Sequence, residues 1–314
     1  MNLAVFFLSI TPAFTILAIL FVNQPKIFKK DFGIYLLKLL ICSLITLRIA
    51  LYANGVSIHQ TILSFETLDE SIFFYTAFAG IGFNEEMAKL VPILFLLYLS
   101  DRWKSKQDVY FSCIFVGAFF AAFENLFVPM YSASLSHLVI RSLVAVPAHL
   151  AFACLMGYFI NLMMKCSVKE GYAESSPKIG AISWFLQIVI FIKFAIFFLD
   201  VNFSEAPFEL KLFTILSIVF IVMLVVELIV ISYDFQRFKW LLGWNLRMTY
   251  ALFALIIPAV LHGLHDWGCS RFTGTHLLHF YLSLVFTYIT IIFFTYYKVN
   301  KQAQVDLQFK TVTT

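Results

Sequence analysis

Charge is scarce in this sequence. Of its 314 residues only 13% are charged, whereas 61% are hydrophobic and the mean hydropathy is +0.90. Water-soluble domains usually carry about 25% charged residues. The composition therefore excludes a soluble globular protein and predicts a polytopic membrane protein, with membrane lipid as its surroundings.

Disulfide frameworks and common catalytic motifs are also missing. The five cysteines form no CxxC pair, and there is no HExxH sequence, no phosphate-binding glycine loop and no internal repeat. We therefore expect no redox chemistry. The net charge of +4 reflects membrane topology, as described below, and does not indicate binding to nucleic acid.

Nine apolar stretches are long enough to cross a membrane, which takes about 20 helical residues. They are 3–22, 32–53, 71–100, 109–131, 139–164, 181–199, 208–233, 248–267 and 276–297. The first lacks a basic n-region and a cleavage site, so we expect it to be retained as a helix. The fold class predicted is an all-α membrane helix bundle: a single domain at 1–299 with its core at 71–267, followed by a tail at 300–314.

Basic residues mark alternate loops between these stretches. The segments after the first, third, fifth, seventh and ninth stretches each carry three Lys or Arg residues, whereas the loops between them hold only Arg271. By the positive-inside rule the N-terminus is expected outside and the C-terminal tail in the cytoplasm.

Glu85 and Glu86 are adjacent inside the third stretch. A carboxylate at the centre of a membrane helix costs about 2.5–3.5 kcal/mol on insertion scales, so the pair needs partners or a function. An ion pair with Lys89 on the same helix is the simpler interpretation, but one lysine cannot neutralise both acids.

The fourth, fifth and eighth stretches carry polar residues at a matching depth. Counted from the cytoplasmic end of each stretch, Glu85, Glu124 and His149 lie 16 residues in, and His262 lies 15. At about 1.5 Å of rise per residue, all four would lie roughly 22–24 Å above the inner boundary, in the outer half of the hydrocarbon core. Asp266 is one turn after His262, so it shares the same helix face and lies further out. We therefore predict that these residues line one polar pocket that opens outward.

Each of these residues also has a structural interpretation. His149 could be a neutral packed histidine bonded to a backbone carbonyl. Glu124 and Asn125 could be hydrogen-bonding contacts between helices, and His262 with Asp266 could be a cap at the membrane interface. We assign His265 to the interface.

Carboxylates and histidines around one point are suited to hydrolysis of a peptide or an ester. A glutamate can activate water as a general base while histidine and Asp or Asn donors stabilise an oxyanion. The same side chains would also suit Zn²⁺, and the residue types leave both mechanisms open. A proton- or cation-coupled transporter is an alternative, although the sequence shows no inverted repeat, and an inactive relative that binds membrane partners is another.

The chain resembles the PrsW membrane proteases, within the wider group of CAAX prenyl endopeptidases and bacteriocin-processing relatives. The resemblance rests on four motifs in order: Glu85-Glu86 followed by Lys89, FxxxEN at 120–125, Arg141 with His149, and HGLHD at 262–266. It implies an intramembrane endopeptidase of the bacterial cytoplasmic membrane. Its implied substrates are single-pass membrane proteins such as anti-sigma factors, cut on the outer side in regulated proteolysis.

The resemblance and the chemistry together suggest roles. Glu85 or Glu86 would activate a water, and we favour Glu85 because Glu86 is better placed to be held ionised by Lys89. Positioning of the water or stabilisation of the tetrahedral intermediate would fall to His149, His262 and Asp266. The supporting or substrate-binding residues would be Lys89, Glu124, Asn125 and Arg141, and a metal, if present, would be bound by Glu85, Glu86, His149 and His262.

The chain departs from the prenyl endopeptidases at two positions. Those enzymes carry Arg four residues after the second Glu and His at the end of FxxxH, whereas this chain has Lys89 and Glu124. We therefore do not expect prenylated CAAX substrates, and we expect His149 to take the place of the missing histidine.

Overall fold

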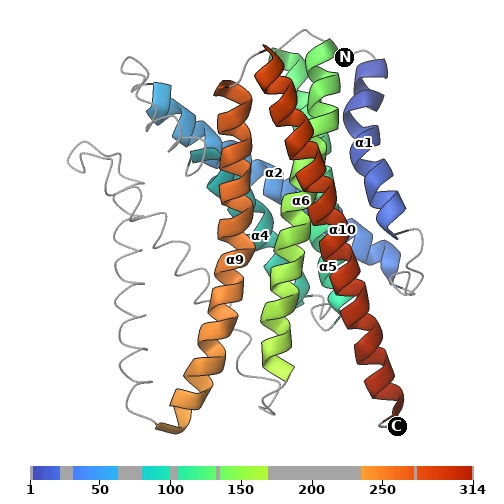
Figure 1. Ribbon diagram of the computed structural model, residues 1–314, viewed down its shortest axis with the longest axis vertical. Coiled ribbons are helices and arrows are strands. Elements are labelled where there is room, and N and C mark those ends of the chain that lie inside the picture. The colour runs from blue at the N-terminus through green and yellow to red at the C-terminus, as the bar shows by residue number, and fades with distance from the viewer. Residues whose placement is uncertain are drawn as a thin grey trace, which may run out of the picture. The chain divides into compact units, whose positions relative to one another are not determined.

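The computed structural model describes residues 3–21, 31–62, 80–99, 105–131, 135–168, 235–271 and 274–312, and over these ranges the chain is helical (Figure 1). The helices are α1 (Leu3–Phe21), α2 (Phe32–Ile62), α4 (Phe83–Leu99), α5 (Lys106–Tyr131), α6 (Leu135–Val168), α9 (Phe235–Arg271) and α10 (Gly274–Val312). The all-α prediction is confirmed for this part of the chain.

Five of the described helices are long and apolar enough to span a membrane, so this is an integral membrane protein. Their spans are Phe32–Asn54, Lys106–Leu126, Leu138–Met163, Tyr250–Cys269 and Gly274–Lys301, and a shorter apolar segment lies at Ser9–Leu20 in α1. The predicted stretches 181–199 and 208–233 lie outside the described residues. The number of nine spans and the orientation therefore stay predictions.

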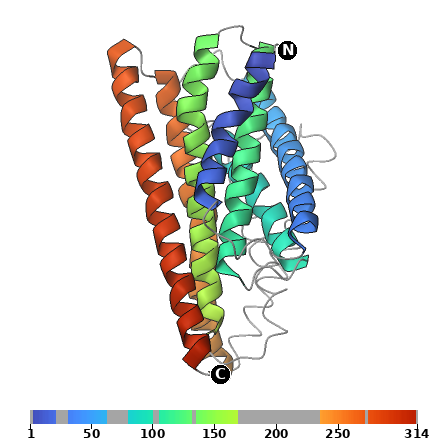
Figure 2. The same ribbon diagram turned by 90° about the vertical axis from the view of Figure 1, so that its right-hand side faces the viewer.

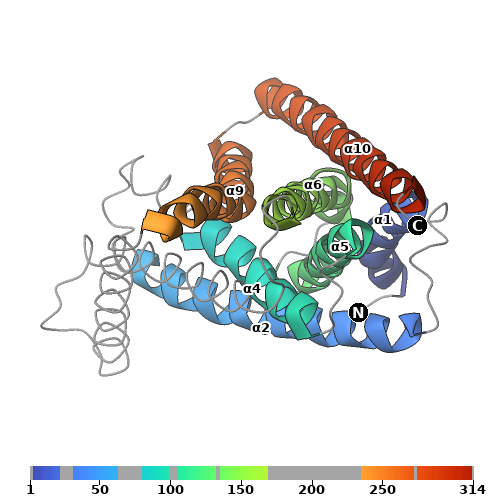
Figure 3. The same ribbon diagram turned by 90° about the horizontal axis from the view of Figure 1, so that it is seen from below.

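The chain divides into two compact units, residues 1–161 with 253–314 and residues 162–252. In the first unit α5 is central, because it contacts α1, α2, α4 and α10 (Figures 2 and 3). Most of the α5 and α6 spans is buried, whereas most of the α10 span is exposed. Of the second unit, the structure describes only the helical residues 162–168 and 235–252.

Helices α5 and α6 approach each other closely at Gly117. A Cβ atom added there would lie only 2.5 Å from the Cβ of Ala153. This contact is one turn from His149 along α6, so the glycine helps to determine where that histidine lies relative to α5.

Helix α4 is preceded by a change in helix type. A π-helical turn at 80–82 leads into the α-helix at Phe83, so Glu85 and Glu86 lie in its first α-helical turn. The predicted stretch 71–100 is helical over 80–99, and its first part, 71–79, lies outside the described residues. Carboxylates are favoured near a helix N-terminus, where the backbone dipole is positive, and π-helical turns occur frequently at functional sites.

Candidate active site

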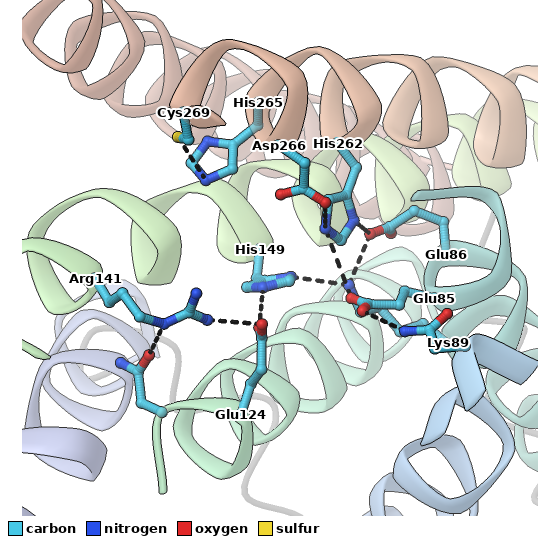
Figure 4. Close-up of polar contacts among 12 residues, drawn as sticks. Glu85, Glu86, Lys89, Glu124, Arg141, His149, His262, His265, Asp266 and Cys269 are labelled. Atoms are coloured by element: carbon cyan, nitrogen blue, oxygen red, sulfur yellow. Dashed lines mark hydrogen bonds and ion pairs between the residues drawn. The ribbon is translucent and has the colours of Figure 1, made fainter. Parts of the chain in front are cut away.

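Polar side chains from four helices meet in one cluster inside the first unit (Figure 4). It contains all nine residues that the sequence nominated: Glu85, Glu86 and Lys89 from α4, Glu124 and Asn125 from α5, Arg141 and His149 from α6, and His262 and Asp266 from α9. The predicted convergence of the four helices is confirmed.

A buried lysine joins α4 to α6. Lys89 Nζ lies 2.7 Å from Glu86 Oε1 and 3.1 Å from His149 Nδ1. It also lies 4.4 Å from the centre of the Phe120 ring, in a cation–π contact. Lys89 and Glu86 are 1% and 0% exposed, so water does not screen this ion pair. The interpretation of a pair confined to α4 is incomplete, because the same ammonium also orients His149.

His149 is held from both sides of its ring. Because a lysine ammonium only donates, Nδ1 accepts from Lys89, and Nε2 carries the hydrogen that is donated to Glu124 Oε2 at 2.6 Å. The other oxygen of Glu124 accepts from Arg141 Nη2 at 2.6 Å, and Arg141 Nε donates to Asn125 Oδ1 at 3.2 Å. The partners of His149 are thus side chains of the predicted site, not the backbone carbonyl of the structural interpretation.

Three carboxylates surround His262. Its Nδ1 donates to Glu86 Oε1 at 2.9 Å, and its Nε2 lies 3.6 Å from Glu85 Oε2 and 3.7 Å from Asp266 Oδ2. Phe152 stacks on the imidazole, with ring centres 5.2 Å apart. The arrangement fixes the ring and leaves Nε2 facing two carboxylates at distances too long for direct hydrogen bonds.

Glu85 has one engaged oxygen and one that is available. Its Oε1 accepts a hydrogen bond from Asn54 Nδ2 at 2.8 Å. Its Oε2 is buried and has no hydrogen-bond partner among the described residues. A buried carboxylate oxygen in this condition is costly, so it points to a group that the site is built to receive.

The cluster is buried on one side and partly exposed on the other. The side chains of Glu124, Asp266 and Arg141 are 33%, 31% and 24% exposed, whereas Glu85 and Glu86 are buried. The first three residues are therefore the most exposed members of the cluster.

Glu85, His149 and His262 could hold a metal ion. Each offers one ligand atom, and these atoms lie within 4.8 Å of one another. One carboxylate and two imidazoles are a donor set used by catalytic zinc sites, which keep a further position open for water or substrate. Glu85 Oε2, which has no hydrogen-bond partner among the described residues, is available to bind such an ion.

One residue has partners that the sequence did not predict, and another was not nominated. His265, which we assigned to the interface, is buried at 7% exposure, with Nδ1 3.1 Å from the Tyr288 hydroxyl and Nε2 3.7 Å from Cys269 Sγ. Asn54 was not nominated, and its only sequence signal was an amide directly after the second apolar stretch.

Comparison with known proteins agrees with this geometry. No curated protein and no solved structure matches the chain. A family model described as PrsW family intramembrane metalloprotease matches residues 32–232, more than half of the chain. The match includes Glu85, Glu86, Glu124 and His149, and the structure adds His262, which lies beyond it, to the same cluster. The chain belongs to the PrsW family of intramembrane metalloproteases.

Proposed function

We propose that this protease cuts membrane-anchored proteins near the outer face of the membrane, and that Glu85, His149 and His262 form its reacting centre. The observation that carries the proposal is the convergence of these three buried side chains from separate helices. Hydrolysis of a peptide requires activation of water and stabilisation of negative charge on the carbonyl oxygen. Carboxylate and imidazole groups in a buried site can do both.

The donor set fits a divalent ion such as Zn²⁺. Glu85 Oε2 and His262 Nε2 are 3.6 Å apart, and two ligands of a tetrahedral zinc lie about 3.4 Å apart when each bond is about 2.1 Å. When bound, the ion would polarise water and the peptide carbonyl. His149 would complete the set by exchanging one of its present contacts.

The remaining residues orient this centre. Glu86 accepts from Nδ1 of His262 and so directs Nε2 toward Glu85 and Asp266. Glu86 is less suited to act as the base, because Lys89 and His262 both donate to its Oε1 and stabilise its charge. Its Oε2, like that of Glu85, is buried without a hydrogen-bond partner among the described residues. The proton of the attacking water would pass to Asp266, the second carboxylate beside His262 Nε2, when Glu85 binds an ion, and to Glu85 in a metal-free mechanism. The same carboxylate then returns the proton to the leaving amine.

The substrate is proposed to be a single-pass membrane protein. The partly exposed residues Glu124, Arg141 and Asp266 lie on the side from which an extended substrate strand would reach the centre. The family resemblance favours an anti-sigma factor cut in the bacterial cytoplasmic membrane, and the depth count favours a cut near the outer surface. The proposal includes nine spans with an outside N-terminus, a core at 71–267 within a domain at 1–299, and a cytoplasmic tail at 300–314.

The test uses Glu85→Gln, Glu86→Gln, His149→Ala and His262→Ala, assayed for cleavage of a membrane-anchored reporter. His279→Ala, an exposed histidine on α10, is the matched control. Each variant is checked for a monodisperse folded form in detergent, and zinc content is measured on the purified protein. We expect cleavage to fall at least about 100-fold in the Glu85 and His262 variants and to be unchanged in the control. Full activity in all four variants would refute the proposal.

A further inference from the structure

One side chain reaches the cluster from a helix that contributes no motif. Asn54 lies on α2 and donates its amide hydrogen to Glu85 Oε1 at 2.8 Å. The other polar members come from α4, α5, α6 and α9, so Asn54 adds a fifth helix to the site.

Small residues bring α2 close enough for this contact. Ala50, one turn before Asn54, and Ala88, almost one turn after Glu85, are both 1% exposed and pack in one cluster with Phe120. Residues three or four positions apart share a helix face, and small side chains let two helix backbones approach closely. The short asparagine side chain can therefore span the gap to α4.

The hydrogen bond makes the two oxygens of Glu85 different. Oε1 is fixed by Asn54, while Oε2 has no hydrogen-bond partner among the described residues and lies 3.6 Å from His262 Nε2. The terminal torsion of a glutamate has a broad, nearly two-fold profile, so an unanchored carboxylate turns easily. An amide bonded to one oxygen removes this freedom.

We infer that Asn54 is a positioning residue, which holds Glu85 with Oε2 directed at His262 and so sets both metal affinity and turnover. The inference rests on the proposed function, because it takes Glu85 as part of the reacting centre. Asn54 acts through Glu85 and needs no contact with the substrate. Removal of a residue that hydrogen-bonds to a metal ligand typically lowers metal affinity or activity by about 10- to 100-fold.

The experiment is a double-mutant cycle between Asn54 and Glu85. Asn54→Ala and Asn54→Leu, each alone and combined with Glu85→Gln, are purified as the full chain in detergent. Zn²⁺ affinity is measured by equilibrium dialysis, and kcat and KM are measured on the reporter. Asn54→Leu fills the space that the amide occupied, so the test can still be carried out if Asn54→Ala does not fold. Ser43→Ala is the control, since Ser43 is buried on the same helix and bonds the backbone oxygen of Leu39.

We expect the Asn54 variants to lose about 10- to 100-fold in Zn²⁺ affinity and in kcat, with KM unchanged and with the Ser43 control at wild-type values. In the Glu85→Gln background the Asn54 substitutions should change Zn²⁺ affinity no further. Wild-type affinity and kcat in both Asn54 variants, with cleavage lost in Glu85→Gln, would overturn this inference and leave the proposed function standing. An equal loss of affinity in both backgrounds would also overturn it. Full cleavage by Glu85→Gln would overturn both.

Discussion

Replacing Lys89 by methionine should destabilise the protein more than any change to an exposed lysine. The substitution keeps most of the side-chain volume but removes the ammonium that contacts Glu86 at 2.7 Å, His149 at 3.1 Å and the Phe120 ring at 4.4 Å. Glu86 is 0% exposed, so its carboxylate is left without a compensating cation and without water.

The magnitude follows from the burial of the pair. Removing one partner of a buried ion pair costs about 3–5 kcal/mol, and His262 still donates to Glu86 Oε1 at 2.9 Å. We therefore expect a loss near the lower limit, about 3 kcal/mol. Glu86→Gln should cost a similar amount, because it leaves the lysine unpaired. The double variant removes both charges, so its cost should fall short of the sum of the two by about 2–3 kcal/mol.

The assay is equilibrium unfolding of the purified protein in mixed lipid–detergent micelles, with each variant refolded to test reversibility. Lys298→Met is the matched control, because Lys298 also lies over a phenylalanine ring, at 5.4 Å, but on α10 near the end of its span. Its free energy of unfolding should change by no more than about 0.5 kcal/mol. Equal effects at the two lysines, or additive effects of Lys89→Met and Glu86→Gln, would show that the buried pair does not exist as described.

Three further outcomes are expected. Gly117→Ala should destabilise the protein by about 1–3 kcal/mol, because its methyl group would lie 2.5 Å from Ala153 Cβ. Gly33→Ala, whose methyl group would meet no atom within 4 Å, is the control and should stabilise the protein by about 0.5–1 kcal/mol. Equal unfolding curves for the two variants would contradict the α5–α6 contact. Arg141→Met should lower the free energy of unfolding by less than about 1 kcal/mol, since the ion pair between Arg141 and Glu124 is partly exposed. The same variant should reduce reporter cleavage about tenfold. Cleavage at the wild-type rate would contradict a role for this ion pair. Chelation should abolish cleavage and Zn²⁺ should restore it, whereas activity of metal-free protein would establish a glutamate-dependent mechanism.

The helices were predictable because membrane spans depend on hydropathy, which is read directly from the sequence. The stretch 109–131 predicted α5 at Lys106–Tyr131, and 139–164 predicted α6 at Leu135–Val168. The helices run past the apolar stretches because backbone hydrogen bonding continues after hydropathy falls. The π-helical turn at 80–82 was not predictable in this way, since it is as apolar as the residues around it.

That the site residues would meet was predictable, but their individual partners were not. Rise per residue is nearly constant along a helix, so counting brought Glu85 and His262 to one level. Contacts also depend on how each helix is rotated about its axis, which single-sequence counting does not give. His265 faces Tyr288 at 3.1 Å, and Asn54 faces Glu85 at 2.8 Å, because of rotations that only packing fixes.

The adjacent acids have different surroundings for a geometric reason. Successive residues of an α-helix point about 100° apart, so Glu85 and Glu86 approach His262 at different ring nitrogens, Nε2 and Nδ1. Glu86 faces Lys89 and His262, whose donors engage one of its oxygens at 2.7 and 2.9 Å. Glu85 faces the neutral amide of Asn54, which engages one oxygen without supplying a charge. Lys89 thus compensates the charge of Glu86, which orients His262, whereas the neutral donor on Glu85 leaves its charge for the proposed reaction, and a single acid could not serve both purposes.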